Sequence, residues 1–316
     1  MKIVVTGGAG FIGRHTVDRL LEQQHEVIVI DWLDEGRKTY EDRRVRFYPA
    51  ELGSEKIGVI IAKEKPECVI HLAAQVSVQT AQQDPLLDAT HNIMNTIHLL
   101  KQCVDNHVRK IIFSSSAAVY GNPQRLPIDE QHPVDPLSFY GVSKLVSEMY
   151  IQSFAAQYEL DYTILRYANV YGPGQTIKGE GAVVASFVSR LGAGERPVIF
   201  GDGLNTRDFI YVKDVAAANV AALTSGSGQT MNISTRQPLT IQDLHRMVSE
   251  ICNSSLTPTY QKSKEGDIQH SLLDASLAKS SLKWSPMYSI YEGLKETVDV
   301  SIAQDPVAVL GVGLNG

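Results

Sequence analysis

Tyr140 and Lys144 lie four residues apart in the segment YGVSK (140–144), which opens an amphipathic stretch with helical periodicity. Residues at this spacing project from one face of a helix, so the phenol and the ammonium group would be neighbours. A nearby positive charge favours the phenolate and lowers the pKa of a phenol, which suits a general base. The same spacing also arises by chance on amphipathic helices, so the pair needs support from elsewhere in the chain.

Two strand ends carry polar groups that could join this pair. The segment SSSAAVYG (114–121) follows the apolar run KIIF, which predicts serine hydroxyls at the end of a buried strand. The segment TILRYANVYGPGQ (163–175) also starts like a buried strand, but polar side chains interrupt it before glycine and proline end it: Arg166, Tyr167, Asn169 and Tyr171. Polar residues there mark either the point where a strand surfaces or the wall of a ligand site.

The loop TGGAGFIG (6–13) lies directly after an apolar strand and directly before a helix, the context expected of a dinucleotide-binding loop. Gly7 and Gly8 suit the tight turn, and Gly10 lets the backbone approach a pyrophosphate. Gly13 allows close packing of helix on strand. The N–H groups and positive dipole end of the helix would face the phosphates. Beside this loop, chance no longer explains the Tyr140–Lys144 pair.

Asp31 ends the second predicted strand, where a carboxylate can accept hydrogen bonds from the adenosine ribose hydroxyls. A carboxylate at this place repels a 2′-phosphate, so the sequence favours NAD over NADP. Arg37 could serve a 2′-phosphate, but it lies well past the strand end, and we interpret it as a solvated loop residue.

These residues require elements that bring them together. Buried β-branched segments alternate with helical ones, which predicts parallel βαβ units and an α/β, Rossmann-type, doubly wound sheet. Strands are expected at 2–7, 26–31, 67–74, 110–116 and 161–172, and helices at 11–24, near 92–107 and at 139–158. We assign residues 1–175 to this domain and 176–304 mainly to a smaller, interwoven C-terminal substrate lobe. Residues 305–316 lack periodicity, and we expect them to be disordered or an expression artefact.

Composition excludes several other classes of protein. The net charge of −6 over 316 residues gives no footprint for nucleic acid or an anionic membrane surface. The longest apolar run is far shorter than a membrane span, and the N-terminus shows no signal-peptide pattern. The three cysteines are far apart and the nine histidines lack metal-ligand spacing, so we predict no disulfide or metal site. We expect a soluble cytosolic protein.

Six segments together resemble the extended short-chain dehydrogenase/reductases that act on nucleotide sugars, nearest to the UDP-glucose 4-epimerase pattern. They are TGGAGFIG, HLAAQVSV, SSSAAVYG, YGVSK, LRYANVYGPGQ and FGDGLNTRDFIYVKDVA, and they occur in consistent order along residues 1–300. The resemblance implies NAD as cofactor, a UDP-sugar as substrate and a homodimer. It also implies Ser116 as the catalytic hydroxyl, Tyr140 as the base, and Lys144 as its activator and ribose anchor.

The resemblance assigns further residues to the two ligands. The cofactor would contact Gly7, Gly10, Phe11, Ile12, Gly13, Asp31, Leu72, Ala73, Ala74, Asn92, Tyr140, Lys144 and Tyr167, with Asn92 supporting the active-site lysine through its backbone and a water. The substrate would contact Ser116, Tyr140, Asn169, Val183, Val198, Phe200, Arg207, Lys264, Asp267 and Ser271.

Several substrate residues have specific expected roles. Phe200 would offer an aromatic face to the uracil, although a core phenylalanine is a serious alternative. Arg207 would bind the diphosphate, and Lys264 replaces the arginine of the family's R-x-G-D element, whose Asp267 would brace the pocket. Ser271 would face the C2 substituent of the sugar, where a small residue leaves room for an N-acetyl group. Alternatively, Ser271 merely starts a strand, SLLD (271–274).

The two residues after Ser116 limit the class of reaction that the enzyme can catalyse. Dehydratases of this family usually carry an acidic residue at these positions, and UDP-glucuronate decarboxylases also tend to carry one. This chain has Ala117 and Ala118 there. We therefore predict an NAD-dependent UDP-hexose 4-epimerase. Another nucleotide-sugar enzyme, such as a UDP-glucuronate 4-epimerase or an atypical dehydratase, is the alternative. A non-catalytic NAD sensor is expected to have lost the Tyr–Lys pair, which this chain retains.

Overall fold

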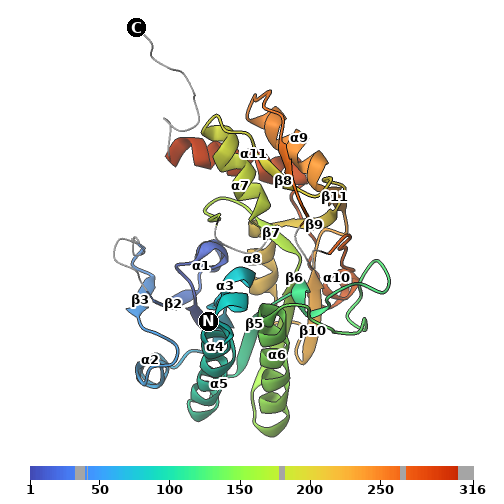
Figure 1. Ribbon diagram of the computed structural model, residues 1–316. Coiled ribbons are helices and arrows are strands. Elements are labelled where there is room, and N and C mark those ends of the chain that lie inside the picture. Colours follow the sequence, from blue (N-terminus) through green and yellow to red (C-terminus); the bar gives the residue numbers. More distant parts are fainter. Residues whose placement is uncertain (33–39, 41, 178–181, 264–267, 305–316) are drawn as a thin grey trace.

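A computed structural model describes residues 1–32, 40, 42–177, 182–263 and 268–304 (Figure 1). Its centre is a seven-stranded sheet, parallel throughout, in the order β10-β6-β5-β4-β1-β2-β3. The strands are β1 (Lys2–Thr6), β2 (Glu26–Asp31), β3 (Val45–Pro49), β4 (Cys68–His71), β5 (Lys110–Ser116), β6 (Asp161–Tyr167) and β10 (Gln229–Ile233). The strand order reverses between β1 and β4, which confirms the doubly wound fold and creates a crevice at their carboxyl ends.

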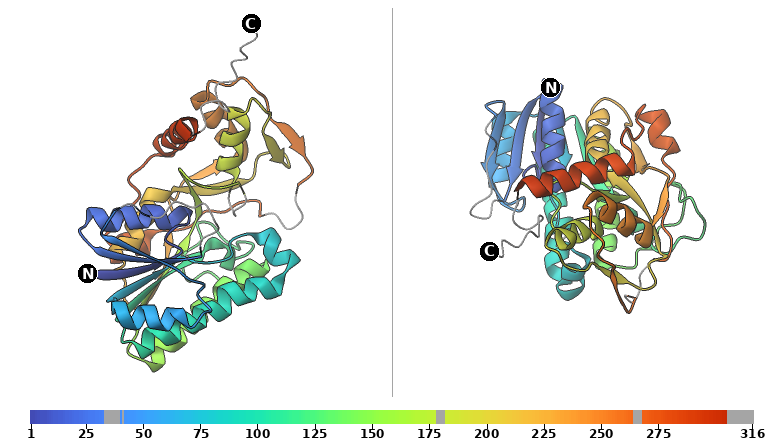
Figure 2. Two further views of the ribbon diagram at one scale, coloured as in Figure 1. Left: turned by 90° about the vertical axis from the view of Figure 1, so that its left-hand side faces the viewer. Right: turned by 90° about the horizontal axis from the view of Figure 1, so that it is seen from above.

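Helices cover both faces of this sheet because its strands are apolar on both sides. Successive residues of β1 point to opposite faces: Ile3 and Val5 pack with Val17 and Leu20 of α1 (Phe11–Glu22), whereas Val4 packs in the core of the other face. Figure 2 shows α1 on one side of the sheet and α2 and α6 on the other. The helices around the sheet are α1, α2 (Lys56–Glu64), α3 (Val78–Gln83), α4 (Pro85–Ala89), α5 (Asn95–Asp105), α6 (Phe139–Gln157) and α8 (Val212–Ala221).

A smaller lobe lies beyond the carboxyl ends of the sheet (Figure 1). It contains a three-stranded sheet of β7 (Asn169–Tyr171), β9 (Thr206–Tyr211) and β11 (Pro238–Thr240), and the pair β8 (Val198–Phe200) and β12 (Thr259–Gln261). Helices α7 (Val183–Gly192), α9 (Ile241–Ile251) and α11 (Ile290–Gln304) share a core with these strands, while α10 (Ser276–Ser281) packs on the large sheet. Because β10 and α8 return to the large sheet, the two lobes are interwoven, as predicted.

Several predicted boundaries were wrong. The strand expected at 161–172 is two strands, since the chain leaves the large sheet after Tyr167 and β7 pairs with β9 of the smaller one. The expected strand 67–74 ends at His71, after which the chain lines a cleft. The helix expected near 92–107 begins with a π-helical turn, η1 (Thr90–Met94), before α5. The segment 271–274 forms only an isolated bridge, between Leu273 and Ile128. Among the described residues, no helix is long and apolar enough to cross a membrane.

Candidate active site

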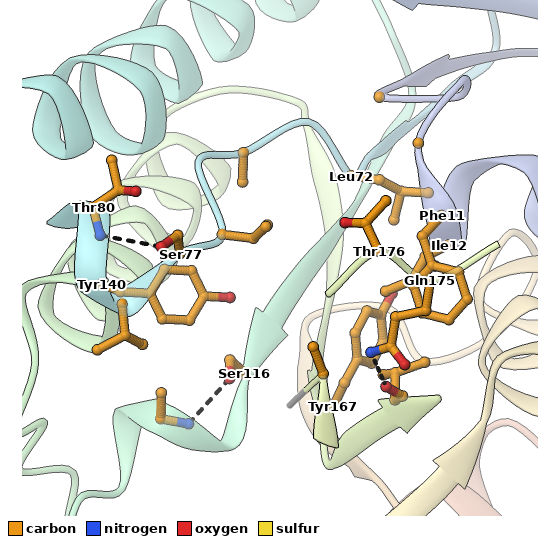
Figure 3. Close-up of a pocket in the computed structure, with 18 of the residues that line it drawn as sticks. Phe11, Ile12, Leu72, Ser77, Thr80, Ser116, Tyr140, Tyr167, Gln175 and Thr176 are labelled. Carbon is orange, nitrogen blue, oxygen red and sulfur yellow. Dashed lines mark hydrogen bonds between the residues drawn. The ribbon is translucent and has the colours of Figure 1, made fainter. Parts of the chain in front are cut away.

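A cleft of about 2490 Å³ runs along the carboxyl ends of the parallel strands and up to the smaller lobe. A site for one drug-sized ligand is roughly 300–1,000 Å³, so this cleft has room for two ligands. Figure 3 shows several of the predicted residues from residues 1–175, and the cleft as a whole brings together predicted residues from both lobes. These are Gly7, Gly10, Phe11, Ile12, Gly13, Asp31, Leu72, Ala73, Ala74, Ser116, Tyr140, Tyr167, Asn169, Val183, Val198, Phe200, Arg207 and Ser271.

The glycine-rich loop is shaped by close backbone contacts. Gly7 has a φ of +71°, and a Cβ there would lie 2.6 Å from the backbone nitrogen of Ala73. A Cβ on Gly13 would lie 2.1 Å from the carbonyl oxygen of Gly7, so only glycine lets α1 begin this close to β1. The N-terminus of α1, capped by Gly10, therefore faces the cleft with backbone N–H groups that suit a pyrophosphate.

Two side chains hold this loop in place. Asp31, at the end of β2, accepts a hydrogen bond of 2.8 Å from the backbone N–H of Ala9. The hydroxyl of Tyr40 donates to the carbonyl oxygen of Gly8 at 2.5 Å. The carboxylate of Asp31 is thus fixed at the edge of the cleft, where a ribose would present its hydroxyls. Arg37 lies outside the described residues.

Helix α6 presents the Tyr–Lys pair at the end of β5. Ser138 caps the helix by accepting a hydrogen bond of 3.0 Å from Gly141 N, which places Tyr140 in the first turn. Lys144 is buried, its Nζ donates to the carbonyl oxygen of Ser114 at 2.9 Å, and it lies 5.9 Å from the centre of the Tyr140 ring. Figure 3 shows the Tyr140 hydroxyl and Ser116 facing the same space. Ser116 Oγ accepts a hydrogen bond of 3.1 Å from Ala118 N.

Asn92 lies in the π-helical turn η1, a feature often found at functional sites. Its side chain donates to Asp88 at 2.9 Å and to Ser143 of α6 at 3.1 Å, and it exchanges two hydrogen bonds with the backbone of Gln75. Asn92 therefore ties the loop after β4 to the helix that carries Tyr140. Its expected support of Lys144 stays a prediction.

The polar groups at the end of β6 separate into two sets. Tyr167 and Asn169 line the cleft, as the ligand-wall interpretation requires. The Tyr167 hydroxyl, however, donates to Asn219 Oδ1 at 2.5 Å, and burial raises the pKa of Tyr167, so this hydroxyl already has a partner within the protein. Arg166 points away from the cleft, to Glu148, and Tyr171 donates to the carbonyl oxygen of Ile290.

The smaller lobe contributes the far end of the cleft. Phe200 on β8 is 39% exposed, which argues against the core alternative. Arg207 and Ser271 meet at Thr206, since Arg207 Nη1 and Ser271 N both donate to its carbonyl oxygen, at 2.9 and 3.1 Å. Lys264 and Asp267 lie outside the described residues.

The sequence analysis missed several cleft residues in the segments that come after strand ends. Trp32, Glu51 and Leu52 follow β2 and β3, Ser77 and Thr80 follow β4, and Gln175 and Thr176 follow β7. Their position after parallel strands was the signal that could have identified them. Within the described ranges, no three His, Cys, Asp or Glu side chains are grouped as metal ligands would be.

A doubly wound sheet with a glycine-rich loop at its switch point, and a Tyr–Lys pair facing a serine at the same edge, defines a dinucleotide-dependent enzyme. The chain belongs to the NAD dependent epimerase/dehydratase family, whose model matches residues 3–234. This confirms the resemblance to extended short-chain dehydrogenase/reductases and identifies NAD as the cofactor. The cradle of Gly7 and Gly13, which a Cβ would fill, fits this group.

Solved structures of nucleotide-sugar enzymes superimpose closely. UDP-glucose 4-epimerase of Thermotoga maritima, solved with UDP-glucose, is 42% identical with a TM-score of 0.93, covering 96% of this chain and 99% of that one. UDP-N-acetylglucosamine 4-epimerase of Methanobrevibacter ruminantium M1, in complex with UDP-N-acetylmuramic acid, is 36% identical, with a TM-score of 0.91 and coverages of 96% and 98%. UDP-glucose 4-epimerase of Thermus thermophilus, in complex with NAD, is 34% identical, with a TM-score of 0.89 and coverages of 95% and 98%.

Proposed function

We propose that the protein is a UDP-hexose 4-epimerase, an isomerase that interconverts UDP-glucose with UDP-galactose and UDP-GlcNAc with UDP-GalNAc. The observation that carries this proposal is the placement of Tyr140 and Ser116 at one edge of the cleft, with the buried Lys144 5.9 Å from the centre of the Tyr140 ring and with Ala117 and Ala118 beside Ser116. No carboxylate at these two positions can assist the loss of a hydroxyl from the substrate. Oxidation and re-reduction at one carbon is the chemistry that these residues support.

In this proposal Tyr140 accepts the proton of the substrate 4-hydroxyl, and Ser116 holds the same oxygen by a hydrogen bond. The ammonium group of Lys144 stabilises the phenolate of Tyr140 before the reaction. Bound NAD would supply the hydride acceptor and donor for C4. The ketosugar rotates between the two transfers, and Tyr140 then gives the proton back to the oxygen. The product has the same atoms as the substrate, with C4 inverted.

The division of the cleft follows the two lobes. We assign the cofactor to residues 1–175 and the UDP group mainly to residues 176–304, with Phe200 against the uracil and Arg207 against the diphosphate. Lys264, proposed to bind the diphosphate, and Asp267, proposed to brace the pocket, lie outside the described residues. Ser271 is proposed to leave space beside the sugar C2.

A panel of UDP-sugars tests this function. Purified protein is incubated separately with the glucose, galactose, GlcNAc, GalNAc and glucuronate forms, and products are resolved by chromatography. We expect each of the first four to convert to its 4-epimer. Conversion of UDP-glucuronate alone, or release of water from any substrate, would contradict the proposal.

We also propose a cytoplasmic homodimer. Helices α4, α5 and α6 lie next to one another (Figure 1) and carry exposed apolar side chains, including Leu86 (80% exposed) and Met149 (58% exposed). Apolar groups gathered on one surface favour association. Light scattering coupled to size-exclusion chromatography is expected to give twice the chain mass, and Met149→Glu to shift it towards the monomer. A monomeric wild-type protein would contradict this proposal.

A further inference from the structure

A buried ion pair lies behind the catalytic edge, outside the cleft residues described above. Glu148 sits on α6 one helical turn beyond Lys144, and Arg166 sits on β6. Arg166 binds Glu148 through two hydrogen bonds, from Nε at 3.0 Å and from Nη2 at 2.5 Å, and their side chains are only 8% and 2% exposed. A bidentate arginine–carboxylate contact of this kind fixes the relative orientation of the two side chains as well as their distance.

Further hydrogen bonds connect this pair to the neighbouring strands. Ser115 Oγ donates to Glu148 at 2.5 Å, and Arg166 Nη1 donates to the Tyr120 hydroxyl at 3.0 Å. Tyr120 in turn donates to Asn232 of β10 at 2.7 Å. One network therefore joins α6 to β5, β6 and β10, and each buried polar group in it has a partner.

This network sets the register of α6 against β5. Lys144 binds the carbonyl oxygen of Ser114, and Glu148, one turn later, binds the hydroxyl of Ser115. Ser116 follows at the cleft, and Tyr140 lies one turn before Lys144 on the same helix. In the sheet, Ser115 pairs with Arg166, so the partner of Glu148 comes from the strand directly beside β5.

We propose that Glu148 and Arg166 are positioning residues, which hold α6 at the register that places Tyr140 opposite Ser116. They touch neither ligand in this proposal and act only through the helix and the strand. The inference rests on the proposed epimerase activity, which the turnover of the wild-type protein decides separately. A displacement of reacting groups by about 1 Å can cost roughly 100-fold in rate, so a small loss of register has a measurable effect.

The test replaces the pair without leaving a buried charge. Removing one partner alone exposes the other as an uncompensated buried ion, which destabilises a fold strongly, whereas apolar replacement of both is often tolerated. The double variant Glu148→Met/Arg166→Met therefore separates register from stability. The control is Lys110→Met/Asp161→Asn, which removes the ion pair (3.4 Å) at the opposite end of the same two strands, β5 and β6.

Thermal unfolding, retained NAD, kcat, KM and the pH profile of kcat are measured for each protein. We expect the Glu148/Arg166 variant to fold and retain NAD, with kcat lowered by about 10–100-fold and KM within about threefold of wild type. We also expect the acidic limb of its pH profile of kcat to move to higher pH. Because the substitution removes one charge of each sign, such a shift reports a changed Lys144–Tyr140 geometry. The Lys110/Asp161 control is expected to keep the kcat of the wild type and an acidic limb at the same pH.

Two milder variants keep the proposal testable if the double variant does not fold. Arg166→Lys keeps the charge without the bidentate contact, away from the cleft. Ser115→Ala removes the contact of Glu148 with β5 and, since Ser115 also lines the cleft, is interpreted together with Arg166→Lys. Each is expected to lower kcat several-fold and to shift the acidic limb in the same direction. Wild-type kcat and pH profile in these variants, or an equal loss of kcat in the Lys110/Asp161 control, would overturn the proposal.

Discussion

The carboxylate of Asp31 lies 2.8 Å from the backbone nitrogen of Ala9, so the residue expected to bind the ribose also holds the glycine-rich loop. We expect the cofactor to co-purify with the protein because the proposed reaction cycle never requires its release. We expect that cofactor to be NAD rather than NADP because the negative charge of Asp31 disfavours a 2′-phosphate. Denaturing the protein and assaying the supernatant for NAD and NADP measures this directly.

Asp31→Asn keeps an acceptor for Ala9 but loses the charge. We expect this variant to retain less NAD and to discriminate less against added NADP. Asp105→Asn, on the exposed surface of α5, serves as the control for loss of a carboxylate. Preferential retention of NADP by the wild-type protein would reject the assignment of Asp31.

Tyr140→Phe removes the phenolate oxygen that is proposed to accept the substrate proton. General acid–base help is worth roughly 10²–10⁴-fold, so we expect a loss of kcat in this range, with the fold and bound NAD unchanged. Tyr150→Phe, on the same helix but 40% exposed, is the matched control and should keep wild-type turnover. Near-normal epimerisation by Tyr140→Phe would exclude Tyr140 as the base.

Ser271→Tyr tests the space beside the sugar. Ser271 lines the cleft with Ser116 and Tyr140, and a bulky ring there would overlap an N-acetyl group. We expect turnover of UDP-GlcNAc and UDP-GalNAc to fall at least tenfold more than that of the unacetylated pair, a difference of about 1.4 kcal/mol. Ser280→Tyr on α10, away from the cleft, controls for added bulk. Equal losses on both pairs would indicate general damage to the site instead.

The burial of His71 leads us to expect that the protein loses stability in acid. Burial lowers the pKa of this histidine to about 3 from its usual 6.5, and its ring is held between Thr6 (2.8 Å) and Thr96 (3.0 Å). The unfolded chain therefore binds a proton between pH 6.5 and 3 that the folded chain does not, so stability falls as pH falls through this window. At pH 5 the protonation of His71 in the unfolded chain lowers the free energy of unfolding by about 2 kcal/mol, which is 1.5 pH units at roughly 1.4 kcal/mol each.

Urea unfolding at pH 7 and pH 5 measures this effect. We expect His71→Gln, which keeps polar groups near both threonines, to be less stable at pH 7 but to lose about 2 kcal/mol less than wild type between the two pH values. His107→Asn replaces an exposed histidine at a positive φ that asparagine tolerates, and should leave the pH dependence unchanged. An identical pH dependence in wild type and His71→Gln would show that another group titrates.

The parallel sheet and the loop could be read from local patterns. The apolar runs of β1, β2 and β5 are buried on both faces, which makes them continuous rather than alternating in sequence. The spacing of Gly7 and Gly13 reflects contacts within one short turn, and the Tyr140–Lys144 spacing reflects a single helix. Each of these signals spans only a few residues, so local sequence was enough to predict the sheet, the loop and the Tyr–Lys pair.

Contacts between distant segments determine the rest of the site. The hydroxyl of Tyr167 binds Asn219 and Arg166 binds Glu148, so two adjacent polar residues of one strand have unrelated partners. Phe200 is exposed to the cleft only because its strand, β8, belongs to the smaller lobe, which forms the far end of the cleft. Which polar groups line the cleft, and which hold α6 in register, therefore depends on long-range packing. No local pattern encodes such partners, since side chains on opposite faces of a strand meet whatever the complete fold places there.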